Sequence, residues 1–161
     1  MEHNSFNNLV ELLKSQVILY SEIRDVLQEE QKAITDWNVK FMFELNKKKD
    51  QLSKREKLLE EARKTLSLRI REEHSLNSDS LQDIIDCCDD QVMQDSLISL
   101  RDNLLIIVSE ISQVSTTLKM LYSTNLKIID DVKVRMGYFP SNKYGMDKNI
   151  SSIPSSLHIV G

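Results

Sequence analysis

Few side chains in this sequence have the type and spacing that catalysis or metal binding requires. The histidines His3, His74 and His158 are scattered, with no Cys, Asp or Glu at the spacing of a metal site. No glycine-rich loop precedes a helix-forming segment, so a phosphate-binding turn is not indicated. A helical bundle can host carboxylate chemistry, but it needs inward-facing Glu and His pairs that are missing here. We therefore expect a protein that is not an enzyme and needs no cofactor.

Aspartates and two adjacent cysteines gather in the middle of the chain. The aspartates lack the loop spacing and the glycine of a calcium motif, and a solvated helix N-terminus explains them better than a metal site. They are Asp79, Asp83, Asp86, Asp89 and Asp90. A disulfide between the neighbours Cys87 and Cys88 would be strained, and there is no third cysteine. We expect free thiols, buried or half-buried, in a reducing compartment.

A basic block precedes this acidic segment. Its chemistry suits phosphates or an acidic partner, but also a solvated face that is matched by the acidic residues further along. Its members are Lys47, Lys48, Lys49, Lys54, Arg55 and Lys57. The formal net charge of -4 opposes a general role in binding nucleic acid, whose affinity comes largely from cationic side chains.

Glycine and proline are confined to the end of the chain. All 3 glycines and both prolines lie from Gly137 onward, so residues 1–136 contain neither. Because Gly costs about 1 kcal/mol and Pro about 3 kcal/mol inside a helix, their absence favours long helices. With many charges and only 6% aromatic residues, an elongated all-α bundle or coiled coil is expected, and a deep enzyme pocket is not.

The last helix has the most regular pattern. From Leu97 onward, apolar residues follow a 3,4 spacing over five heptads, which predicts packing along the full helix length. This seam contains Leu97, Leu100, Leu104, Ile107, Ile111, Val114, Leu118, Leu121, Asn125, Ile128 and Val132. Further apolar residues widen the arc to about 160°, more than one partner helix covers. The excess is explained either by a third helix of the same chain or by a groove for an amphipathic partner helix.

The first half repeats the pattern in two columns of seven-residue spacing. A break is plausible at residues 35–38, where Asp36 or Asn38 could cap a new helix. The polar stretch 74–79 predicts a turn, with Asp79 and Gln82 forming a capping box. We expect three, or four, long helices near residues 5–34, 37–73 and 79–136.

The charges predict how the chain folds back. Residues 47–71 carry ten Lys and Arg against four Asp and Glu, whereas residues 79–104 carry seven Asp against one Arg. A hairpin near residue 76 would place these opposite charges side by side, which favours antiparallel packing.

These patterns divide the chain into two parts after residue 136. Residues 1–136 form the helical bundle, and residues 137–161 form a flexible tail that carries apolar anchors. The spacing of Ile150, Ile153, Leu157 and Val160 suits a segment that covers an empty groove, but also a solvated linker.

This layout resembles the FlgN-type flagellar export chaperones. The resemblance rests on the opening segment 9–20 with Leu27 and Glu30, the stretch from Lys49 to Leu59, the long apolar helix with Asn125, and Tyr144-Gly145. It covers residues 5–145 in layout.

The resemblance implies a chaperone that binds hook-associated proteins of the hook–filament junction and delivers them to the flagellar type III export apparatus. Its partners would be these clients and the export gate with its ATPase complex. In this family the C-terminal half embraces an amphipathic terminal segment of the client, and a tail tyrosine contributes to docking at the export gate. Tyr122, Tyr138 and Tyr144 compete for that role, and we favour Tyr138 and Tyr144 in the tail. The expected client-binding residues are Leu118, Leu121, Tyr122, Asn125, Leu126, Ile129, Val132 and Met136.

A structural coiled-coil spacer or adaptor that self-associates is the alternative. A chaperone predicts a monomer or weak dimer with spare apolar surface, and a spacer predicts a stable homo-oligomer without it. The run from Leu104 to Val108 stops at Ser109 and Glu110, and no segment approaches the length of a membrane span, so no stable membrane insertion is expected. Residues 1–15 lack the pattern of a secretory signal, and the expected location is the cytoplasm.

Overall fold

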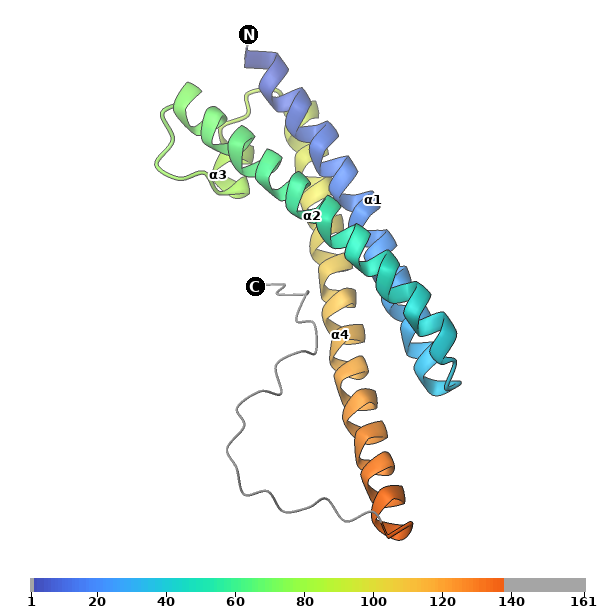
Figure 1. Ribbon diagram of the computed structural model, residues 1–161. Helices are drawn as coiled ribbons and strands as arrows, with labels where there is room; N and C mark the ends of the chain where they lie inside the picture. The colour runs from blue at the N-terminus through green and yellow to red at the C-terminus, as the bar shows by residue number, and fades with distance from the viewer. Residues whose placement is uncertain (1, 138–161) are drawn as a thin grey trace, which may run out of the picture.

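The computed structural model describes residues 2–137, and this range is all-α. It contains α1 (Glu2–Thr35), α2 (Val39–Glu73), α3 (Leu81–Asp86) and α4 (Gln91–Arg135). The predicted fold class is confirmed, with three long helices and one short one forming an elongated assembly (Figure 1). Apart from Gly137, the predicted flexible tail lies outside the described residues.

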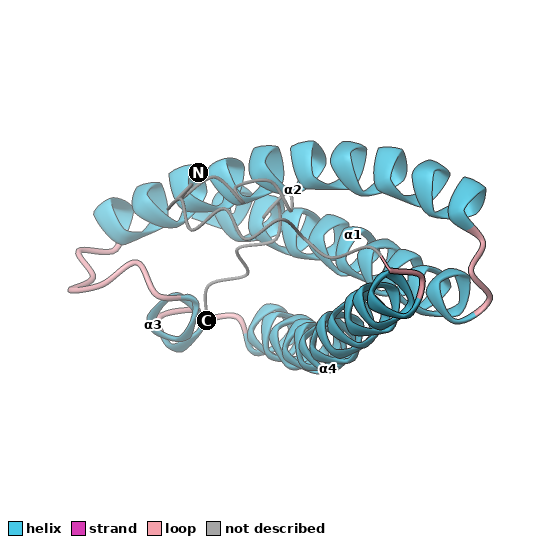
Figure 2. Ribbon diagram, turned by 60° about the horizontal axis from the view of Figure 1, so that its bottom comes forward, coloured by secondary structure: helices cyan, strands magenta, loops and turns pink. Residues whose placement is uncertain are grey.

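Helix α1 is the central element. It packs against both α2 and α4, whereas the backbones of α2 and α4 do not approach each other (Figures 1 and 2). Hydrogen bonds give the directions: Tyr122 of α4 reaches Glu30, and Arg24 reaches Glu110, so α4 runs parallel to α1. Helix α2 runs antiparallel to α1, because Arg55 contacts Glu22 and Lys49 contacts Glu30.

Two core clusters follow the length of α1. The first joins α1 to the N-terminal half of α2 and the middle of α4: Leu19, Ile23, Val26, Leu27, Ala33, Ile34, Leu45, Leu52, Ile107, Ile111 and Leu118. The second joins the start of α1 to the end of α2, α3 and the start of α4: Phe6, Leu9, Val10, Leu13, Ile70, Ile84, Ile85, Cys88 and Leu97. Full burial of each large side chain contributes about 1.5–3 kcal/mol, so these clusters hold the bundle together.

Helices α1 and α2 are separate, which settles a question that the sequence left open. Asn38 caps α2, since its side-chain oxygen accepts a hydrogen bond from the Phe41 N–H over 3.1 Å. Trp37 adopts a φ of 54°, in the left-handed region, and this reverses the chain within three residues.

The expectation of one helix over residues 79–136 is wrong. Ser80, not Asp79, caps α3 by accepting a hydrogen bond from the Asp83 N–H, so the predicted capping box does not form. The Asp90 carboxylate accepts from the backbone N–H groups of Val92 and Met93 and starts a new helix. Short polar side chains that compete for backbone hydrogen bonds therefore divide the segment.

The cysteines between α3 and α4 are free thiols, as predicted. Cys88 is buried in the second cluster and Cys87 is half-buried, and burial raises the pKa of both thiols.

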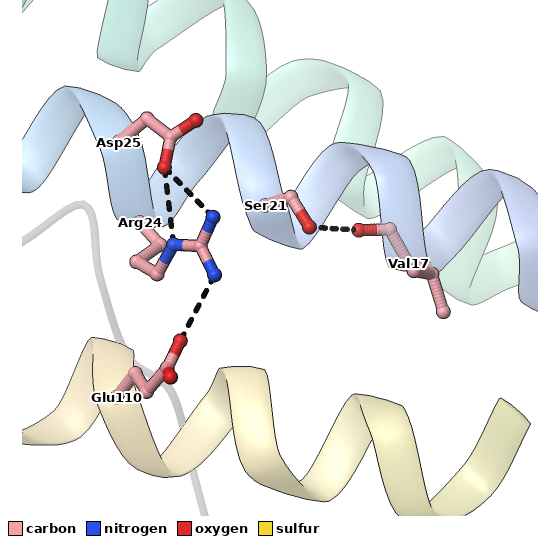
Figure 3. Close-up of polar contacts among 5 residues, drawn as sticks. All are labelled: Val17, Ser21, Arg24, Asp25 and Glu110. Carbon is pink, nitrogen blue, oxygen red and sulfur yellow. Dashed lines mark hydrogen bonds and ion pairs between the residues drawn. The ribbon is translucent and has the colours of Figure 1, made fainter. Parts of the chain in front are cut away.

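The predicted pairing of the basic segment with the aspartate-rich segment holds only locally: α2 contacts α3, and the charge of Asp79 helps to raise the pKa of Arg63, but α2 and α4 do not meet. The basic residues of α2 that cross to another helix pair with α1 instead, Lys49 with Glu30 and Arg55 with Glu22. The physical reason is the order of the helices, because α1 lies between α2 and α4. The ion pair to α4 comes from α1: Arg24 Nη1 donates to Glu110 Oε2 over 3.0 Å (Figure 3).

Helix α4 contains a long apolar stretch. By length and composition it could cross a membrane, so the expectation that no segment approaches a membrane span is wrong. Among the described residues it is the one helix that meets this criterion. It is weak evidence for a span, because α4 packs on α1 through its seam and carries Glu110 in an ion pair.

Candidate functional site

The apolar seam of α4 is longer than the helix that covers it. Every seam position from Leu97 to Asn125 is buried or half-buried, which confirms the predicted packing over this part of the helix. The seam continues to Ile128 and Val132, but these residues are 46% and 45% exposed. They are exposed because α1 ends at Thr35, opposite this part of α4 (Figure 1).

Within residues 2–137, the C-terminal end of α4 therefore presents an apolar surface without a partner, which we call the free face. It consists of Leu126, Ile128, Ile129, Val132 and Met136, with exposed fractions between 39% and 81%. By steps of 100° per residue these side chains lie within an arc of about 160° that is continuous with the seam. Val134 is also exposed but lies on the opposite side of the helix.

Helix α4 continues intact to its end because local signals support it. Lys133 and Arg135 in the last turn match the negative end of the helix dipole. Gly137 then adopts a φ of 77°, a conformation that glycine reaches without strain and that ends helices. The free face thus lies on a regular helix.

A buried polar junction marks where the covered part of α4 ends. Glu30 of α1 is 2% exposed, and both of its carboxylate oxygens accept hydrogen bonds from Lys49 Nζ over 2.8 Å. The Tyr122 hydroxyl donates to Glu30 Oε1 over 2.5 Å. Burial, followed by this hydrogen bond, raises the pKa of Tyr122. One carboxylate therefore ties the three long helices together directly above the free face.

A family model described as FlgN protein matches residues 1–132. The chain belongs to the FlgN family. FlgN proteins are flagellar export chaperones, so the family resemblance inferred from the sequence is confirmed. Comparisons with curated proteins and with solved structures give no significant match.

The client-binding residues expected for this FlgN-family protein fall into two groups. Leu118 is 5% exposed, and Leu121 packs against the same cluster. Tyr122 is 37% exposed, but its hydroxyl is engaged by Glu30. Asn125 is half-buried at the boundary. The exposed group consists of Leu126, Ile129, Val132 and Met136. The proposed gate-docking residues Tyr138 and Tyr144 lie outside the described residues.

Ile128 is a free-face residue that the sequence analysis assigned to the seam alone. The signal that could have found it is helix length. Helix α4 has 45 residues and α1 has 34, a difference of about 16 Å at 1.5 Å per residue. A seam that continues beyond its partner helix must end exposed.

The chemistry available at this site is apolar contact. The described residues contain no group of three or more His, Cys, Asp or Glu that could hold a metal ion. Lys127, Asp130, Asp131, Lys133 and Arg135 interrupt the apolar positions with charges of both signs. A helix that presents apolar anchors at i, i+3, i+4 and i+7 is the natural ligand for such a surface.

Proposed function

We propose that this FlgN-family protein is a chaperone for hook-associated proteins of the hook–filament junction. It binds an amphipathic terminal segment of the client on the free face of α4 and delivers the client to the flagellar type III export apparatus from the cytoplasm. The observation that carries the proposal is the continuation of the seam past the end of α1, with Ile128 and Val132 exposed. A client helix placed there would cover the end of the α4 seam in the way that α1 covers the seam before Asn125.

The size of the free face suits reversible binding. Covering the five exposed apolar side chains of the free face gives about 5 kcal/mol in gross terms. Association itself costs about 4–15 kcal/mol, so the client must add contacts of its own beyond these five positions. A complex with this balance releases its client readily, which a delivery chaperone requires.

The direct test is a calorimetric titration of the full chain with a purified hook-associated protein. We expect a 1:1 complex that forms with a negative heat-capacity change, because apolar surface is buried on both partners. A client from which the amphipathic terminal segment has been removed should no longer bind. Unchanged affinity of the truncated client would contradict the proposed mode of binding.

Docking at the export gate is assigned to the tail by the family resemblance. The hydroxyl of Tyr122 is occupied by Glu30, which favours Tyr138 and Tyr144 over it as docking residues. Replacing both tail tyrosines with Ala should leave client affinity unchanged and abolish client export. Loss of client affinity in this variant would assign these tyrosines to client binding instead.

Self-association is the second candidate function, because the free face of one chain could pair with that of another. Sedimentation velocity separates the two functions. We expect a monomer or weak dimer at micromolar concentration in the absence of client. A stable homo-oligomer that loses its affinity when Ile129 is replaced by Asp would support the structural spacer.

A further inference from the structure

Helix α2 has an outward face that the bundle leaves uncovered. Leu45 and Leu52 are buried on the side of α2 that meets α1. On the opposite side, by steps of 100° per residue, lie Val39, Phe43 and several lysines. Neither chaperone binding on α4 nor the bundle core uses this face.

Most lysines in the first half of α2 form no ion pair within residues 2–137. Between Lys40 and Leu58 the sequence carries seven Lys and Arg against three Asp and Glu. Within residues 2–137, ion pairs are formed by Lys49 and Arg55 of this set and not by the other five. Those five are exposed: Lys40, Lys47, Lys48, Lys54 and Lys57. The aspartates of α4 do not neutralise these lysines, because α1 lies between α2 and α4.

Exposed apolar side chains continue this face to the end of the hairpin. Trp37 is 55% exposed, Val39 is 57% exposed and Phe43 is 66% exposed. Val39 and Phe43 are four residues apart and share one side of α2, next to Lys40 and Lys47. An aromatic and aliphatic group bordered by lysines is the composition of surfaces that lie in the headgroup region of a bilayer.

We propose that the outward face of α2 and the Trp37 turn bind an anionic lipid surface peripherally. The lysines, spread over about 26 Å of helix, approach the headgroups, and Trp37 and Phe43 enter the interface. The distribution of cations favours lipid over an acidic protein. Arg55, Arg63 and Arg69 are held in pairs with glutamates, so this face offers lysines, which act as point charges on a diffuse anionic surface.

The experiment uses the full chain without client, so its result is independent of the proposed function. Vesicles of equal parts phosphatidylglycerol and phosphatidylcholine are compared with vesicles of phosphatidylcholine alone. Trp37 is the single tryptophan of the chain, and its fluorescence therefore reports on this end of the molecule. We expect a blue shift and cosedimentation with the anionic vesicles only. Both should vanish at 1 M salt, where the screening length falls to about 3 Å.

Matched variants locate the contact. The triple variant K47Q/K54Q/K57Q should bind on the order of 100-fold more weakly, since each lysine near an anionic membrane contributes about fivefold. The control K14Q/K119Q/K127Q removes the same formal charge from α1 and α4 and should bind like the natural chain. Equal weakening of both variants, or binding without a Trp37 shift, would overturn the proposal. A chain that ignores the anionic vesicles but binds an acidic protein through these lysines would overturn it as well.

Discussion

Replacing Leu126 and Ile129 together with Asp separates client binding from folding. Leu126 is 58% exposed and Ile129 is 39% exposed, so folding buries about half of each side chain. At each position, the free energy of unfolding falls by about 1 kcal/mol for the lost apolar burial and by about 0.5 kcal/mol for the lower helix propensity of Asp. A total near 3 kcal/mol is smaller than the 5–15 kcal/mol by which domains are typically stable. The helical circular dichroism of the variant should therefore be retained.

The effect on client binding is larger. A client helix would cover the remaining apolar surface at both positions, and the variant would require two carboxylates to lose their water instead. We expect a loss of at least about 3 kcal/mol, or more than about 100-fold in affinity, measured by calorimetric titration with a hook-associated protein.

Two controls make the test specific. The variant M120D/V134D changes two apolar residues that are 67% and 52% exposed on the opposite side of α4, and it should bind client normally. Leu118→Asp places a charge at a position only 5% exposed and should unfold the chain. The reasoning is refuted if L126D/I129D unfolds like Leu118→Asp, or if it stays folded and binds client with unchanged affinity.

Three further predictions concern the stability of the bundle. Tyr122→Phe removes the hydroxyl that donates to Glu30 and should lower the free energy of unfolding in urea by about 1–2 kcal/mol; an unchanged urea midpoint would exclude a role for this junction. Asp90→Ala removes the cap of α4 and should cost about 1 kcal/mol, with Asp89→Ala as a nearly neutral control; equal effects of the two would contradict the capping role in a thermal melt. The pKa values of Tyr20 and Tyr122 are raised above the ordinary value of 10.0. The stability that these two protonated phenols contribute is therefore complete below about pH 10 and is lost as the pH rises through their folded-state pKa values. A spectrophotometric titration should show Tyr20 and Tyr122 ionising above the ordinary pKa of 10.0, and their ionisation at pH 10 would contradict it.

Much of the fold could be predicted from the sequence because long-range patterning decides it. The absence of Gly and Pro before residue 137 predicts helices, and the 3,4 spacing predicts which side of α4 meets α1. The break near Asn38 is visible from its capping chemistry. The break before Asp90 was missed, because several neighbouring aspartates look alike in sequence. Only the folded geometry shows which carboxylate reaches the N–H groups of Val92 and Met93.

The opposite net charges of the basic and aspartate-rich segments do not decide the order of the helices. Complementary net charges say that two segments attract, but the order of the helices is set by the apolar seams. Helix α1 carries apolar residues toward both neighbours, so it occupies the centre and supplies Glu22 and Glu30 to the basic residues of α2. The candidate site is partly predictable in the same way: its apolar arc is visible in sequence, but its exposed part depends on where α1 ends.

Site-specific photo-crosslinking tests most directly the claim that the free face of α4 captures the client. A benzoylphenylalanine is placed at Ile129 on the free face and, separately, at Val134 on the opposite side of the same helix turns. Both chains are irradiated with the same purified hook-associated protein. We expect a strong crosslink from Ile129 to the amphipathic terminal segment of the client and little or none from Val134. Equal crosslinking from both positions, or a crosslink from Val134 alone, would contradict it.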